Sequence, residues 1–195
     1  MRNTYRTLRD VADDILEYQR VELIHGDVLT AVATSGAAHR KIVAQITRGF
    51  NDDWHRGRTS VRWELGIGDF QVERVDDPDC FFVPDIAIAY PDTRTNKEFR
   101  ENLVMVVEVT SPKSPETVGN DRVVKRKHYA KAGVALYLLV DQEYGEWHLY
   151  ALAGAWPGYQ VHSWGVYGQP IKLPEPFRFT LRTDEWPTYR PDEDD

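Results

Sequence analysis

Residues 101–141 read ENLVMVVEVTSPKSPETVGNDRVVKRKHYAKAGVALYLLVD, and this stretch decides the fold. It begins with an apolar run that ends at a Ser-Pro pair, which is typical of a buried strand. After a loop rich in Pro, Ser and Thr comes a segment with helical spacing, with Asn120 at its start and Gly133 at its end. A second apolar run follows over 135–142. The order strand, helix, strand predicts one crossover between two strands of a sheet.

The rest of the chain adds short strands and one long helix. Residues 37–54 have Ile42, Ile46 and Phe50 at every fourth position and predict an amphipathic helix of about four turns, with Ser35 as its N-cap. The other expected elements are a helix over 9–17, a hairpin over 20–33 that turns at 25–27, strands within 60–73 and 81–90, and short strands over 146–154, 159–164, 169–173 and 177–181.

These elements predict an α+β protein with an α/β core: a mixed central sheet flanked by helices, followed by a β-rich C-terminal part. The 195 residues suit one domain, which we place at 1–188. Four of the last five residues are acidic, so we expect 189–195 to form a solvated, disordered tail.

Composition excludes several classes of protein. One cysteine, Cys80, excludes an intramolecular disulfide framework and a cysteine-based zinc cluster. No apolar run approaches the roughly 20 residues that cross a bilayer, and the N-terminus lacks the apolar core of a signal peptide. We therefore expect a cytoplasmic protein that does not bind membranes. The formal net charge is −7, so binding of a polyanion would require a locally basic surface or bound metal ions.

Carboxylates stand in three apolar segments of this sequence. Asp85 follows Pro84 at the start of a strand, and Glu108 interrupts the run LVMVVEV, where alternation places Val104, Val106, Glu108 and Thr110 on one face. On a central strand Glu108 would need a partner, a proton or a metal ion; on an edge strand it would simply face water. Glu22, in VELIHGD, is the third, and a half-exposed strand position also explains it.

The helix after the loop is basic. Asp121, Lys125 and Tyr129 have the spacing i, i+4, i+8 and fall on one stripe. The cations are Arg122, Lys125, Arg126, Lys127 and Lys131. A solvated charged face is one explanation of this run. The other is a site in which carboxylates at strand ends hold Mg²⁺ or Mn²⁺ and a lysine stabilises charge on a phosphate, as phosphodiester hydrolysis requires.

The segments VELIHGD, AAHRKIVAQI, VPDIAIAY, VVEVTSP and DRVVKRKHYAKAGVALYLLVD resemble, in this order, the Uma2 family, also called DUF820. This family comprises restriction-endonuclease-like proteins of the PD-(D/E)XK nuclease superfamily. The resemblance implies a metal-dependent endonuclease that uses Mg²⁺ or Mn²⁺ to cut nucleic acid, expected to be DNA. It also implies a homodimer.

The resemblance assigns roles to particular residues. Asp85 and Glu108 correspond to metal ligands. Thr110 occupies the position two residues after Glu108 where the superfamily often has lysine; the family instead draws its lysine from the following helix, at a place that Lys125 matches. Glu22 matches a third catalytic carboxylate. We expect Arg122, Arg126 and Lys127 to contact nucleic acid, and His39, Asp121 and Tyr129 to support the site.

The match is incomplete in places. His25 replaces an acidic residue before Gly26, Gln142 replaces a proline after Asp141, and no motif identifies 153–188. Two other functions stay open: a catalytically inactive module that keeps the nuclease fold and binds nucleic acid or protein, and a metal-dependent hydrolase of small phosphate esters.

Overall fold

The computed structural model describes residues 20–24, 27–31, 36–57, 59, 61–74, 76, 80–110, 120–154 and 158–188, with only the backbone for 20–24, 27–31 and 120–121. In chain order the elements are β1 (Arg20–Ile24), β2 (Asp27–Ala31), α2 (Ala37–His55), β3 (Glu64–Gly66), β4 (Val72–Glu73), β5 (Phe81–Phe82), β6 (Ile86–Ala89), α3 (Asn96–Glu101), β7 (Leu103–Val109), the π-helical turn η1 (Asn120–Lys125), α5 (Arg126–Lys131), β8 (Leu136–Asp141), β9 (Glu146–Leu152), β10 (Tyr159–Val166), β11 (Ile171–Lys172) and β12 (Thr180–Leu181).

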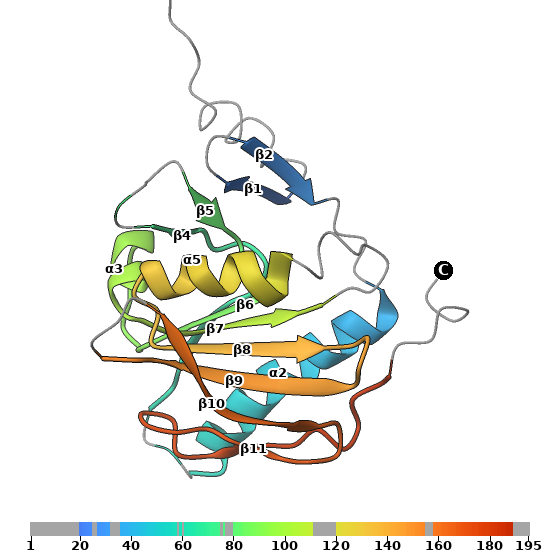
Figure 1. Cartoon of the computed structure of the whole chain (residues 1–195). Coiled ribbons are helices and arrows are strands. Elements are labelled where there is room, and N and C mark those ends of the chain that lie inside the picture. Colours follow the sequence, from blue (N-terminus) through green and yellow to red (C-terminus); the bar gives the residue numbers. More distant parts are fainter. Residues whose placement is uncertain are drawn as a thin grey trace, which may run out of the picture.

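A six-stranded mixed sheet with the order β10-β9-β8-β7-β6-β3 forms the centre of the molecule (Figure 1). Its parallel pair is β7 and β8, joined by η1 and α5, and its other neighbours are antiparallel. The predicted crossover and the mixed α+β sheet are therefore confirmed. β7 lies between β6 and β8, so Glu108 is on a central strand and the edge-strand explanation is wrong.

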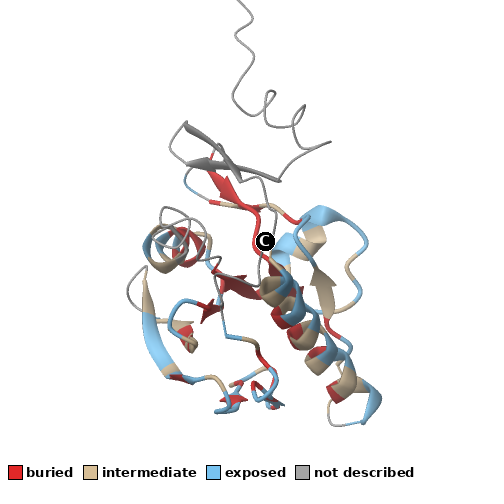
Figure 2. Ribbon diagram, turned by 90° about the vertical axis from the view of Figure 1, so that its right-hand side faces the viewer, coloured by how far each residue is buried: buried red, intermediate tan, exposed pale blue. Residues whose placement is uncertain are grey.

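The two main helices cover opposite faces of this sheet, as Figures 1 and 2 show from two directions. α2 buries Ile42, Ile46 and Phe50 against one face, where the rings of Phe177 and Phe179 meet Phe50 edge to face at 5.3 and 4.9 Å between centroids. α5 buries Tyr129 against the other face, in a second cluster with Val106 and Tyr137. The periodicity of apolar residues in 37–54 therefore predicted the buried face of α2 correctly.

The N-terminal hairpin belongs to a second sheet, with the order β2-β1-β5-β4. Ile24 pairs with Asp27, so the hairpin turns where the sequence predicted. Residues 81–90 divide at 83–85: β5 joins this second sheet, while β6 joins the central one. Asp85 is thus placed where the chain passes from one sheet to the other.

Two local predictions are wrong. The N-cap of α2 is Gly36, one residue after the predicted Ser35, and no side chain caps the helix. Val104 does not share the face of Val106, because the ladder between β6 and β7 shifts register between Ile88 and Ala89, and Val104 packs on the α2 side of the sheet.

Helix α3 was not predicted from the sequence. It begins with a capping box in which the Thr95 hydroxyl accepts from the Glu98 amide at 3.2 Å and the Glu98 carboxylate accepts from the Thr95 amide at 3.1 Å. The signal was present as Thr95-x-x-Glu98, but none of its residues is buried, so no apolar period marks it.

The predicted helix over 9–17 and the tail 189–195 lie outside the described residues. In the part of the chain that is described, no helix is long and apolar enough to cross a membrane.

Candidate active site

Glu108 lies near the carboxyl end of β7, with 2% of its surface exposed. Its Oε1 accepts a hydrogen bond from the Tyr129 hydroxyl at 2.6 Å and lies 3.2 Å from Nζ of Lys125. Lys125 is itself buried, and its ammonium lies 5.6 Å from the centre of the Phe82 ring. A buried carboxylate is tolerated when a cation and a hydrogen-bond donor compensate it, and Glu108 has both.

The backbone that carries Lys125 and Tyr129 changes its winding at this point. η1 ends at Lys125 and α5 begins at Arg126, so the backbone changes from a π-helical to an α-helical conformation beside the buried pair. Such turns are frequent at functional sites. At the other end of α5, Gly133 has φ +78°, and the amide of Val134 donates to the Tyr129 carbonyl at 3.1 Å, which closes the helix as the sequence predicted.

Asp85 lies at the same end of the sheet, because Ile86 pairs with Val107 and the residue before it therefore reaches the end of β7. Its Oδ2 accepts from the Val109 amide at 2.7 Å and lies 3.1 Å from Nε2 of His39. His39 belongs to the first turn of α2, and its Nδ1 is buried with no hydrogen-bond partner among the described residues. The structure thus places His39 in contact with Asp85, and its supporting role stays a prediction.

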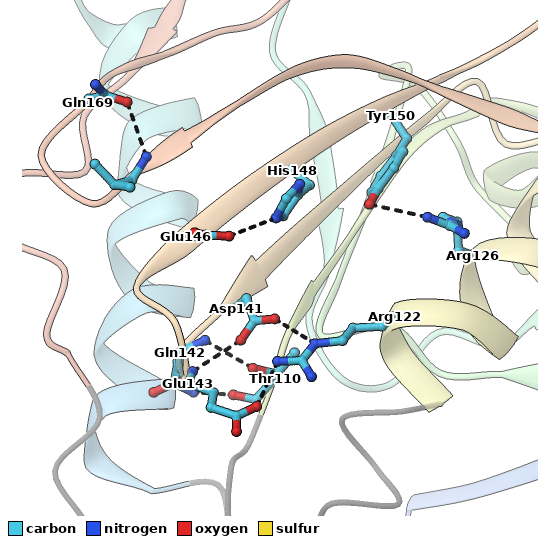
Figure 3. Close-up of polar contacts among 11 residues, drawn as sticks. Thr110, Arg122, Arg126, Asp141, Gln142, Glu143, Glu146, His148, Tyr150 and Gln169 are labelled. Atoms are coloured by element: carbon cyan, nitrogen blue, oxygen red, sulfur yellow. Dashed lines mark hydrogen bonds and ion pairs between the residues drawn. The ribbon is translucent and has the colours of Figure 1, made fainter.

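A polar network continues along the carboxyl ends of β7 and β8 (Figure 3). The Gln142 amide donates to Oγ1 of Thr110 at 3.0 Å, and the Gln142 side chain donates to the Thr110 carbonyl. Arg122 of η1 reaches this edge, with 2.7 Å from Nε to Asp141 and 2.7 Å from a terminal nitrogen to Glu143. The hydrogen bond with Asp141 raises the pKa of Arg122 further. Sequence reasoning missed this network.

His128 anchors the other side of α5. Its Nε2 donates to the Val72 carbonyl at 2.8 Å, which leaves Nδ1 as an acceptor 3.5 Å from the Cys80 thiol. Burial lowers the pKa of His128 to about 4, so the ring is neutral at neutral pH. These contacts join α5 to the second sheet and hold the helix that carries Lys125 and Tyr129.

The remaining predicted site residues differ in how they are placed. Arg126 donates to the Tyr150 hydroxyl at 3.3 Å, and Lys127 is exposed. Glu22 lies on β1, one residue before the Leu23 that pairs with Phe81, and Asp121 lies on η1, but the side chains of both are outside the described part of the structure.

The donor set suits a hard divalent cation. Asp85 and Glu108 supply carboxylate oxygens, and Mg²⁺ commonly binds through one or two carboxylates while it keeps several waters. In the described ranges no group of three or more His, Cys, Asp and Glu side chains could hold a metal ion. By their chemistry, Asp85 and Glu108 would fit a two-carboxylate site completed by water and substrate.

The architecture is the restriction-endonuclease-like fold: a mixed sheet between helices, with polar side chains gathered at the ends of its central strands. The chain belongs to the Uma2 family, described as "Putative restriction endonuclease", whose family model matches residues 10–184. No curated protein matches the chain.

A solved structure has the same fold. It is the crystal structure, at 1.96 Å resolution, of a protein from Anabaena variabilis described as "a putative nuclease belonging to DUF820". The alignment covers 85% of this chain and 89% of that chain, with 17% sequence identity and a TM-score of 0.52. At this identity the likeness concerns the fold alone.

Proposed function

We propose that this protein is a divalent-metal-dependent endonuclease that hydrolyses phosphodiester bonds in DNA, with its active site at Asp85, Glu108 and Lys125. The observation that carries the proposal is the buried contact of 3.2 Å between Lys125 and Glu108 at the carboxyl end of β7. Membership of a family described as restriction endonucleases supports nucleic acid as the substrate.

The residues of the chain would divide the work as follows. Asp85 and Glu108 hold the metal ion, His39 orients Asp85, and Tyr129 orients Glu108 through its hydroxyl. Lys125 places a positive charge beside the scissile phosphate, where it stabilises the negative charge that develops in the transition state. Mg²⁺ or Mn²⁺, when bound, polarises the phosphoryl group and lowers the pKa of water. Glu22 is proposed as a third carboxylate.

The flanking nucleic acid would follow the basic helix. Arg126 and Lys127 are proposed to contact phosphates on either side of the scissile bond, and Asp121 to support the helix. Arg122 should bind phosphate more weakly, because it is already paired with Asp141 and Glu143. A homodimer and a cytoplasmic location stay predictions.

The experiment is cleavage of plasmid DNA in Mg²⁺ or Mn²⁺ by the wild type, Asp85→Asn, Glu108→Gln and Lys125→Met. Removal of one group that stabilises transition-state charge lowers kcat by about 10²–10³-fold, which is the loss we expect for Lys125→Met. Lys131→Met is the matched control, because Lys131 is an exposed lysine near the end of the same helix and should keep wild-type activity.

Full cleavage by both Asp85→Asn and Lys125→Met would contradict the assignment. Absence of cleavage in the wild type, together with metal-independent binding of nucleic acid, would favour the inactive binding module instead. Cleavage of nucleotide esters but not of polymers would favour the small-substrate hydrolase.

A further inference from the structure

An exposed tyrosine stands at the rim of the candidate active site. Tyr144 lies in the turn between β8 and β9, and 63% of its surface is exposed. The turn follows the carboxyl end of β8, which is parallel to β7 and next to it. Tyr144 is therefore at the same edge of the central sheet as Glu108, and Gln142 in this turn is hydrogen-bonded to Thr110, two residues after Glu108.

One face of the Tyr144 ring is occupied. The guanidinium of Arg122 lies 4.7 Å from the ring centre, a cation–π contact. The guanidinium is held by ion pairs with Asp141, at the end of β8, and with Glu143, in the same turn as Tyr144. The ring is thus supported from one side by a group that is itself fixed, while much of it remains open to solvent.

Arg122 also connects this ring to the proposed catalytic lysine. It is on η1, three residues before Lys125, so the same short helical turn supports Tyr144 and places the buried ammonium. A ring held in this way loses little conformational freedom when a flat ligand stacks on it, which is the property of a preorganised binding surface.

We propose that Tyr144 is a stacking platform for an unpaired base of the nucleic-acid strand whose phosphate reaches Lys125. This inference rests on the proposed function and predicts a preference for single-stranded DNA, or for duplexes with an unstacked base near the cut, over fully paired DNA. Aromatic side chains that stack bases bind any sequence, because every base has a flat face. The platform would thus add affinity without sequence preference.

The test measures binding in EDTA, so that no cleavage occurs, with a single-stranded oligonucleotide that contains 2-aminopurine and with a fully paired duplex of the same length. Tyr144→Ala should weaken single-strand binding about tenfold, the effect of one stacked base, and should leave duplex binding nearly unchanged. Tyr144→Trp should keep the affinity and the quenching of 2-aminopurine fluorescence, because it retains a stacking ring.

Tyr90→Ala is the matched control. Tyr90 is also an exposed tyrosine, but it follows β6, and its amide bonds to the Asn102 carbonyl just before β7, so it lies at the opposite edge of the sheet. We expect wild-type affinity for this variant.

The outcomes separate the two proposals. Equal single-strand affinity of Tyr144→Ala and the wild type would overturn the platform, while the loss of plasmid cleavage in Lys125→Met would still support the nuclease. Equal losses for single strand and duplex would also overturn the platform, since a paired base offers no free face. Failure of the wild type to bind any nucleic acid in EDTA would overturn the platform, while the cleavage assay in Mg²⁺ or Mn²⁺ would still test the nuclease.

Discussion

Glu108 and Lys125 form a largely buried ion pair, with 2% and 5% of their side chains exposed. Ion pairs at such depth contribute little net stability, because desolvation offsets the attraction, but removal of one partner leaves the other uncompensated. Replacement of either residue should therefore lower the free energy of unfolding as well as change the charge at the candidate site.

At this scale a double-mutant cycle gives the first prediction. Lys125→Met should lower the free energy of unfolding by about 3–5 kcal/mol, because Glu108 would stay buried without its cation. Glu108→Gln/Lys125→Met removes both charges and should recover most of this loss. Urea denaturation of the wild type, both single variants and the double variant measures the coupling, and strictly additive losses would contradict it.

The second prediction concerns pH and His128. Its pKa falls from 6.5 to about 4 on folding, because burial disfavours the charged ring, as do the nearby charges of Arg74 and Lys125. The hydrogen bond to the Val72 carbonyl and the charge of Asp76 raise the pKa by less. Between pH 6.5 and 4 the unfolded chain therefore binds a proton that the folded chain excludes. Stability should fall by about 3 kcal/mol as the pH drops through this window.

Denaturant unfolding at several pH values checks this effect in the wild type and in His128→Gln, whose side-chain amide also carries an N–H donor for Val72. The variant should lose a large part of the pH dependence below 6.5. Identical slopes in the two proteins would assign the effect to other groups.

At the scale of elements, β9 and β10 leave no room for a side chain where Gly165 faces Trp147. Gly165 pairs with Trp147, and a Cβ at this glycine would lie 2.6 Å from the Trp147 ring, which is buried and donates to the Gln169 carbonyl at 3.0 Å. The ring cannot move easily, so β10 needs a glycine at this position.

The third prediction follows from this contact. Gly165→Ala should lower the free energy of unfolding by about 1–3 kcal/mol through overpacking, although alanine in a strand normally stabilises relative to glycine. Val161→Ala, at an exposed position of the same strand, should change it by no more than about 0.5 kcal/mol. Guanidinium unfolding measures both, and a more stable Gly165→Ala would show that Trp147 can shift.

The elements that the sequence predicted are those that a repeated apolar pattern marks. Apolar runs predicted β7 and β8, and the spacing of Ile42, Ile46 and Phe50 predicted α2. α3 buries nothing, and the π-helical turn leaves no mark on the spacing of residues, so neither was predicted.

The candidate site likewise contains residues that the sequence predicted and contacts that it did not. Motif residues such as Glu108 and Lys125 were predicted, and the structure brings these two together. The contacts of Thr110 with Gln142 and of Arg122 with Tyr144 were not predicted. They form at the edge where the parallel neighbours β7 and β8 end, which brings together residues far apart in sequence.

At the scale of the whole molecule, the net charge of −7 opposes binding of a polyanion, so affinity depends on a few cations near the site. Lys125, Arg126 and Lys127, the proposed phosphate contacts, are consecutive in one helical segment. Lys125 is paired with one carboxylate, whereas Arg122 is paired with two.

The fourth prediction is a weak salt dependence. Each phosphate contact on a single strand contributes about −0.7 to the slope of log K against log salt, so three cations predict a slope of about −2. Fluorescence anisotropy between about 50 and 200 mM salt measures it. A slope steeper than about −5 would require a basic surface elsewhere on the chain.

The central position of β7 has a consequence for amide hydrogen exchange. Strands that are paired on both sides and buried on both faces open only with global unfolding, whereas outer strands and turns open locally. We expect deuterium to enter β10 and the turn at 142–145 first and the amides around Glu108 last. Local opening of the outer strands and turns would then leave the backbone that carries Glu108, a proposed metal ligand, in place.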